Sequence, residues 1–198
     1  ALILAAGVQI GPGRCRAAKL AMHHSAQVKR MARRTADLPP LTGLPNLVRE
    51  LRYQEVMRQG VGLALMPVFA FFSTPFLAAF WAGVLCVAAG SLLRVYASGF
   101  IVKNKQLATD GPYSLVRHPL YTGNLLILIG FTVACARWWA PLVAVAFWWF
   151  YYPVAIQYED RKLQRIFGEA WERWSAAVPA VIPRKLIPHG PANWSLMT

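Results

Sequence analysis

The sequence predicts an all-α integral membrane protein with about four transmembrane helices, arranged as two hairpins and followed by a C-terminal interfacial amphipathic helix. Three observations support this fold class. Of the 198 residues, 57% are apolar and only 15% are charged, whereas soluble domains carry about 25% charged residues. The apolar residues form runs long enough for helices to cross a bilayer. The basic residues gather in the segments that would share one membrane face.

The first hairpin is predicted in residues 61–100, an apolar stretch interrupted by Ser73-Thr74-Pro75. A transmembrane helix needs about 20 residues, so a stretch of this length with a central turn signal predicts two helices. Pro67 lies inside the first of them, where bonding from neighbouring helices makes a proline tolerable.

The second hairpin is predicted from two further apolar runs, residues 121–136 and 140–158, with Arg137 in the tight turn between them. Residues 159–174 then alternate apolar and charged positions at three-and-four spacing, which is typical of an amphipathic helix lying in the membrane interface. Apart from small hydroxyls and Asn124, the predicted spans are interpreted as apolar. Asn124 favours either a helix–helix hydrogen bond or a ligand contact, because an amide at this depth needs a partner.

The distribution of basic residues predicts the topology. Ten of the 21 Lys and Arg residues precede the first span, and four are assigned to the middle segment, namely Arg94 near the end of the second span together with Lys103, Lys105 and Arg117. Six follow the fourth span, and only Arg137 lies in a short turn. Because Lys and Arg concentrate on the cytoplasmic side, both termini and the middle segment are expected in the cytoplasm. An odd number of spans would divide these residues between the two faces.

The chain is expected to consist of a basic, mobile N-terminal tail, residues 1–46, and a membrane domain, residues 47–198. The net charge is +13, and a basic segment beside apolar spans is expected to bind anionic lipids. A nucleic-acid partner is not predicted, because no aromatic residue accompanies the basic residues before Tyr53. The opening apolar stretch, residues 1–10, is too short to span a membrane and is not interpreted as a signal peptide. The three cysteines and four histidines lack metal-binding spacings, so no metal site is predicted.

Two polar segments, residues 103–121 and 157–173, are predicted to face the same cytoplasmic interface. Alone, Arg117 would be a phosphate anchor, His118 a structural imidazole, and Glu159 a residue favouring the start of a helix. Together with the neighbouring Asp160 and several tyrosines, they predict a cleft, partly open to water, that could bind a zwitterionic molecule next to an apolar one.

These segments also resemble a known family. Gly111-Pro112-Tyr113 and the run from Arg117 to Gly123 are similar to the signature of the isoprenylcysteine carboxyl methyltransferases, whose wider clan includes phospholipid methyltransferases. The similarity covers residues 91–184, the expected cofactor-binding half. It continues in a second set of matching positions: Glu159-Asp160, Leu163, Phe167-Gly168, Val178-Pro179 and Ile182-Pro183.

The resemblance implies a methyltransferase that uses S-adenosylmethionine (SAM) to methylate a lipid-like or small apolar acceptor at the cytoplasmic face. Carried over by position, the residues implied to bind the cofactor are Gln106, Leu107, Tyr113, His118, Pro119, Leu120, Tyr121 and Glu159. The implied catalytic residues are Arg117, His118 and Glu159. A carboxylate acceptor needs no base, whereas an amine or thiol acceptor would make His118 or Glu159 a candidate base.

One position departs from the family pattern. The carboxyl methyltransferases place an Arg near the substrate carboxylate, four residues before the cofactor glutamate, and this chain has Ala155 there. Arg161 is a candidate substitute, and prenylcysteine is in doubt as the substrate. Two other functions stay open: an NADPH-dependent membrane reductase resembling the sterol reductases, and a non-catalytic membrane scaffold.

Overall fold

The protein is described from a computed structural model that defines residues 34–35, 38–101, 106–184 and 187. Most of the predicted basic tail, residues 1–46, lies outside the described residues. Within the described ranges all regular secondary structure is helical and no strand occurs. The chain divides into two units, Ala1–Glu50 and Leu51–Thr198. Helix α2 (Gly43–Tyr53) begins in the first unit, where Thr35 donates a hydrogen bond to Glu50.

Helix α3 (Glu55–Phe71) lies wholly within the second unit and begins before the predicted start of the first span. The extended backbone of Gln54 separates it from α2. Its first turn therefore contains Glu55 and Arg58, two charged residues that the apolar run starting at residue 61 did not include.

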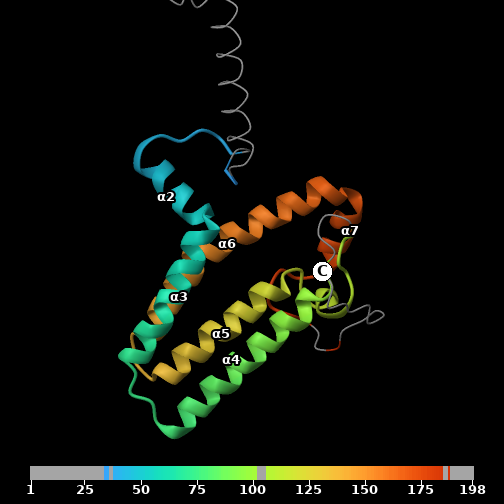
Figure 1. Cartoon of the computed structure of the whole chain (residues 1–198). Helices are drawn as coiled ribbons and strands as arrows, with labels where there is room; N and C mark the ends of the chain where they lie inside the picture. The colour runs from blue at the N-terminus through green and yellow to red at the C-terminus, as the bar shows by residue number, and fades with distance from the viewer. Residues whose placement is uncertain (1–33, 36–37, 102–105, 185–186, 188–198) are drawn as a thin grey trace, which may run out of the picture. The chain divides into compact units, whose positions relative to one another are not determined.

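Helices α4 (Leu77–Ser98) and α5 (Pro119–Cys135) run side by side (Figure 1). Glycines allow this close approach at two levels. A Cβ atom added to Gly83 would lie 2.6 Å from the carbonyl oxygen of Gly130, and one added to Gly90 would lie 2.6 Å from that of Gly123. Small residues at such positions let two backbones pack directly, as in many membrane helix pairs.

Helix α6 (Ala140–Phe167) corrects the predicted boundary of the C-terminal helix. It continues without interruption past Tyr158, because residues 159–167 contain no helix breaker. Gly168 ends it with φ +52°, and a separate helix α7 (Glu169–Ala177) follows. The single amphipathic helix predicted over residues 159–174 is therefore two helices.

Gly168 provides a test of this break. We expect Gly168→Ala to destabilise the protein by about 1–3 kcal/mol, because side-chain-bearing residues rarely adopt its backbone conformation. No atom lies within 4 Å of the added Cβ, so strain in the backbone would be the whole effect. Thermal unfolding in detergent measures it, and an unchanged midpoint would contradict the assignment of strain to this residue.

In the part of the chain that the structure describes, two helices are long and apolar enough to cross a membrane, α4 and α6. Only 17% of the apolar window of α4 is buried within the protein, unlike a core helix of a soluble protein. Helix α5 is apolar but has 17 residues, a length of about 26 Å. Helix α3 also has 17 residues and carries charges in its first turn. Four spans therefore remain a prediction.

Two buried clusters hold opposite ends of the helices together. Phe69, Cys135 and Ala140 pack where α3 ends and α5 turns into α6. Ala97 and Phe100 pack against Tyr113 in the short 3₁₀ helix η1 (Gly111–Ser114), which precedes α5. The space between the clusters contains the site described next.

Candidate active site

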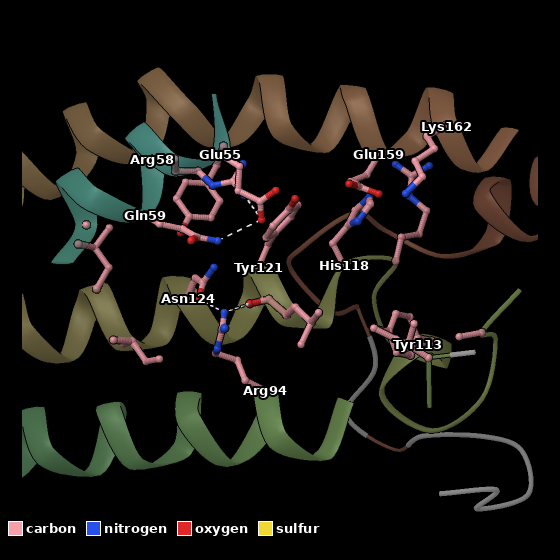
Figure 2. Close-up of a pocket in the computed structure, with 18 of the residues that line it drawn as sticks. Glu55, Arg58, Gln59, Arg94, Tyr113, His118, Tyr121, Asn124, Glu159 and Lys162 are labelled. Carbon is pink, nitrogen blue, oxygen red and sulfur yellow. Dashed lines mark hydrogen bonds and ion pairs between the residues drawn. The ribbon is translucent and has the colours of Figure 1, made fainter. Parts of the chain in front are cut away.

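A cavity of about 830 Å³ lies within the second unit, lined by α3, α4, α5, α6, α7 and the segment around η1. Its polar side chains gather where α3 and α5 begin and where α4 and α6 end. Its apolar side chains come from further along α3 and α5 and from α6. Figure 2 shows the polar part, with Tyr121 between a group containing His118 and Glu159 and a group containing Arg58 and Asn124.

The structure brings most of the predicted site residues to this cavity. The predicted residues in its lining are Gln106, Leu107, Tyr113, Arg117, His118, Leu120, Tyr121 and Glu159. Pro119 does not line it. That residue is among the most deeply buried side chains, at the first turn of α5, where a proline is favoured because its missing N–H has no partner in the helix.

Asp160 joins the two basic residues of the signature. Its Oδ1 lies 2.8 Å from Nε2 of His118, and its Oδ2 lies 3.3 Å from Nη2 of Arg117. His118 is buried, and the side chains of both Arg117 and Asp160 are 18% exposed. Nε2 of His118 is therefore paired with Asp160, so a role of His118 as a base, which stays a prediction, would fall to its other ring nitrogen, Nδ1.

The C-terminal segment fixes the backbone of the same signature. The amide of Arg117 donates to the carbonyl of Pro179 at 2.8 Å, and that of His118 donates to Ala180 at 3.0 Å. The hydroxyl of Thr122 donates to the carbonyl of Val181 at 2.7 Å. The C-terminal part of the matching region, residues 179–181, thus fixes the position of the signature at residues 117–122.

Three groups at the polar end have unused bonding capacity. Nε of Arg117 and Nε1 of Trp174 are buried donors with no hydrogen-bond acceptor among the described residues. The carboxylate of Glu159, although it lines the cavity, makes no hydrogen bond or ion pair with any described residue. A buried donor without a partner is unfavourable, so a bound polar ligand would stabilise this end.

Aromatic rings form the walls between the two polar groups. Tyr121 stacks on His118, with ring centroids 5.5 Å apart, and meets Tyr152 edge-on. The guanidinium of Arg58 lies over both tyrosine rings, at 5.4 and 5.7 Å. Further out, burial raises the pKa of Tyr113 from its ordinary value, so its hydroxyl stays protonated across the neutral range.

Several cavity residues escaped the sequence prediction. Arg94 lies inside α4, within a run interpreted as apolar, and its guanidinium donates to Oδ1 of Asn124. Arg58 and Glu55 belong to the unexpected first turn of α3. Leu163, Phe167 and Trp174 are apolar positions of residues 159–174, the segment predicted to lie in the membrane interface, yet all three line the cavity.

The position that departs from the family pattern does not contribute to the cavity lining. Ala155 is buried at 3% exposure, outside the lining. Arg161, the candidate substitute, also lies outside the lining, and its Nη2 donates instead to the hydroxyl of Tyr53 at 3.2 Å. Among the described residues, no three His, Cys, Asp or Glu side chains come together as a metal site.

Comparison with known proteins confirms the resemblance. Residues 76–170 match the family model described as phospholipid methyltransferase. The chain is 31% identical over 84 residues to protein-S-isoprenylcysteine O-methyltransferase B of Arabidopsis thaliana, covering 41% of each chain. It is 38% identical over 81 residues to methanethiol S-methyltransferase of Crocosphaera subtropica, covering 38% of this chain and 28% of the relative.

The chain is also 34% identical over 116 residues to the cobalt-zinc-cadmium resistance protein CzcN of Cupriavidus metallidurans, covering 58% of this chain and 53% of that protein. In that match and in a second resistance protein from Alcaligenes xylosoxydans, the chain spans about half the length of the relative. No solved structure matches the chain significantly. Residues 76–170, the segment that matches the family model, contain α4, α5 and α6, and so include most of the helices around the cavity.

Proposed function

We propose that the protein is an integral-membrane SAM-dependent methyltransferase that acts on a lipid-like or small apolar acceptor at the cytoplasmic membrane face. The observation that carries the proposal is one cavity with two different ends. Its polar end holds Glu159 and two unpaired donors, and its other end is apolar. Such a cavity suits a water-soluble donor meeting a membrane-soluble acceptor.

The groups at the polar end fit the charges of SAM. Glu159 would bind the ammonium of its amino-acid part, and Nε of Arg117 would donate to its carboxylate. Trp174 would donate its indole N–H, and the face of Tyr121 would attract the sulfonium through a cation–π interaction. The bound cofactor would supply an activated methyl group, and the protein would hold the acceptor at near-attack distance and exclude water.

The topology proposed from the charges is consistent with this arrangement. Glu55 begins α3 and Glu159 lies in the second half of α6, while Arg94 lies in the last turns of α4 and Arg117 precedes α5. All four line the cavity, so its polar end lies at one end of the helices. With four spans and cytoplasmic termini, this end would open to the cytoplasm, where SAM is made available.

Calorimetry on detergent-purified protein tests the cofactor directly. We expect SAM to bind with micromolar affinity and NADPH not to bind. Glu159→Gln should weaken SAM binding about tenfold or more, because it removes a charged partner of the ammonium. Trp174→Phe should weaken it by a smaller factor, because it removes one neutral hydrogen bond.

Glu169→Gln is the matched control, because Glu169 is an exposed acid on α7 outside the cavity lining. It should leave SAM affinity unchanged. Binding of NADPH instead of SAM would favour the reductase, and binding of neither ligand to folded protein would favour the scaffold. Equal SAM affinity in Glu159→Gln and Glu169→Gln would contradict the role proposed for Glu159.

A further inference from the structure

Tyr152 lies where the polar part of the cavity meets the apolar part. Its side chain lines the cavity and is only 6% exposed. Trp148 stacks on its ring with the centroids 3.8 Å apart, and Phe147 meets the ring edge-on at 6.0 Å. The guanidinium of Arg58 lies over the same ring at 5.7 Å. Because neighbours pack against the ring in this way, the direction of its C–O bond is fixed before any ligand binds.

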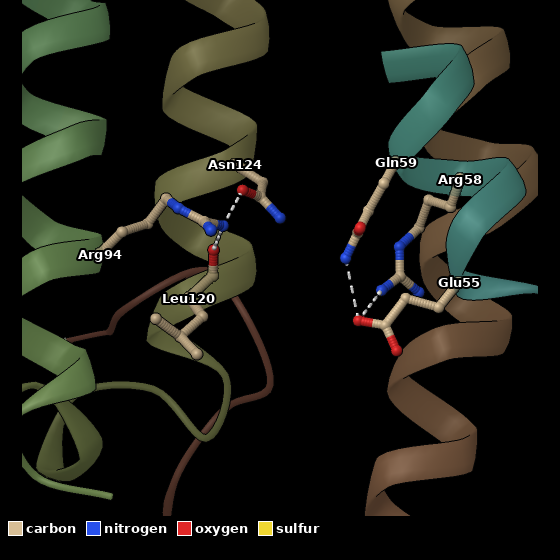
Figure 3. Close-up of polar contacts among 6 residues, drawn as sticks. All are labelled: Glu55, Arg58, Gln59, Arg94, Leu120 and Asn124. Carbon is tan, nitrogen blue, oxygen red and sulfur yellow. Dashed lines mark hydrogen bonds and ion pairs between the residues drawn. The ribbon is translucent and has the colours of Figure 1, made fainter. Parts of the chain in front are cut away.

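The hydroxyl of Tyr152 ends a chain of hydrogen bonds that begins at Arg94. The guanidinium of Arg94 donates to Oδ1 of Asn124. A guanidinium has donors and no acceptor, so the amide of Asn124 turns its oxygen to Arg94 and its NH₂ group away from it (Figure 3). The side chain of Asn124 also forms a hydrogen bond with Tyr152. Since the NH₂ group is on the side away from Arg94, Asn124 donates this bond and the oxygen of Tyr152 accepts it.

Every bond in this chain therefore runs in one direction, from Arg94 toward the cavity. A tyrosine hydroxyl has one O–H donor in addition to the lone pairs on its oxygen. With the oxygen accepting from Asn124, the O–H of Tyr152 is left to donate, and none of the residues that the structure describes accepts it. A buried donor without an acceptor is unfavourable. A ligand that presents a lone pair at this point of the cavity would satisfy it.

The position of this donor relates it to the methyl acceptor. Tyr152 meets Tyr121 edge-on, with ring centroids 5.6 Å apart, and the face of Tyr121 is proposed to attract the sulfonium of SAM. We infer that the O–H of Tyr152 donates to the attacking atom of the methyl acceptor, and that Arg94 and Asn124 are positioning residues that fix the direction of this bond. The inference rests on the proposed methyltransferase function.

Such a bond would select the element that attacks. An oxygen or sulfur atom has a lone pair to attack the methyl carbon and another to accept from Tyr152, whereas a neutral amine nitrogen has only one. The attacking pair forms the new bond to carbon, the bond from that carbon to the sulfonium breaks, and its electrons stay on the sulfur of the donor. A thiol or alcohol also passes its proton to a base, for which His118 is the candidate, and an ionised acceptor passes none. Oxygen and sulfur acceptors are therefore favoured over amines.

Infrared spectroscopy of a bound ketone tests the donor without SAM or turnover. The full chain is placed in nanodiscs of neutral lipid with methyl octyl ketone, isotope-labelled at its carbonyl carbon. A hydrogen bond to the carbonyl lowers its stretching frequency, so we expect a bound band below that of the ketone in lipid, and its loss in Tyr152→Phe. This substitution should also weaken ketone binding about two- to tenfold, because one neutral hydrogen bond is removed. Binding of decane, which has no lone pair, should be unchanged.

Two further substitutions separate the hydrogen bond from folding. Asn124→Asp keeps a partner for Arg94 but turns an acceptor toward Tyr152, so the O–H should donate to the new carboxylate instead. The shifted band should then disappear although the hydroxyl of Tyr152 is still present. Tyr151→Phe is the matched control, because Tyr151 is a buried tyrosine of the same helix that lies outside the cavity lining. It should change neither the band nor the affinity.

The outcomes distinguish this inference from the proposed function. An unshifted carbonyl band, or a shifted band that persists in Tyr152→Phe, overturns the donor role of Tyr152 whether or not SAM binds. A band that persists only in Asn124→Asp overturns the positioning role of Asn124. A shifted band that depends on both residues, in a protein that binds no SAM, supports the donor but overturns the methyltransferase.

Competition between two acceptors tests the selection when SAM does bind. Butylbenzenethiol and butylaniline have similar shapes, and the aniline is uncharged at neutral pH. We expect the ratio of thiol to amine methylation to fall about two- to tenfold in Tyr152→Phe, because the hydrogen bond that favours the thiol is lost. Tyr151→Phe should leave the ratio unchanged. An equal ratio in the unmodified protein and in Tyr152→Phe overturns the selection.

Discussion

Gly90→Ala is expected to destabilise the protein by about 3 kcal/mol, the upper end of the range for overpacking a buried contact. The added methyl would lie 2.6 Å from the carbonyl oxygen of Gly123 and 2.9 Å from Ile127. Ile127 can rotate, but the carbonyl is part of the α5 backbone and cannot move without separating the two helices. Thermal unfolding in detergent, followed by circular dichroism, measures the change.

Gly60→Ala is the matched control, and we expect an effect of the opposite sign. Gly60 also lies within a helix, α3, but nothing lies within 4 Å of its added Cβ. Without a clash, alanine in a helix is more favourable than glycine by about 0.5–1 kcal/mol. If both substitutions were equally well tolerated, α4 and α5 would not be packed backbone to backbone.

The close approach of α4 and α5 also positions Arg94 and Asn124, two side chains that line the cavity. A Cβ on Gly123 would lie 2.6 Å from Cγ of Arg94. The absence of a side chain at Gly123 therefore leaves the space in which the stem of Arg94 crosses to Asn124. Helix packing and site geometry are coupled at this one glycine.

The helices were predictable from the sequence because apolar runs and turn signals are local features. The apolar run after the turn at residues 73–75 and the runs predicted to begin at residues 121 and 140 correspond to α4, α5 and α6. The resemblance pointed to the polar end of the cavity, the proposed cofactor end, for a different reason. Its motif residues are fixed to one another, as shown by the amides of Arg117 and His118 bonding to Pro179 and Ala180. Residues held together in this way keep a recognisable pattern.

The placement of Arg58 and Arg94 in the cavity could not be predicted in the same way. Arg94 is one charge in the 22 residues of α4, so the surrounding apolar side chains concealed it. Arg58 precedes the apolar run of α3 and looked like part of a basic surface segment. Only the three-dimensional packing shows that α3 and α4 bring these two charges to one cavity. The orientation of Trp174 likewise depends on the break at Gly168.

Asp160→Asn is expected to lower both stability and SAM affinity. The carboxylate of Asp160 accepts from Arg117 and His118 at once, through its two oxygens. An asparagine amide keeps one acceptor oxygen and turns a donor toward the other basic group, so one of the two bonds is lost. Leaving such a partly buried group without its partner destabilises a protein by about 1–3 kcal/mol. Displacing Arg117 would also remove the proposed contact to the SAM carboxylate.

A double-mutant cycle with Arg117→Gln separates this effect from a general loss of stability. Because both substitutions break the same ion pair, their effects on the unfolding free energy should overlap, and the double variant should be less destabilised than the sum of the single ones. Asp160→Glu retains the charge and should retain most of the SAM affinity. Strictly additive effects, or SAM binding by Asp160→Asn equal to that of the unmodified protein, would mean that Asp160 does not position Arg117 for the cofactor.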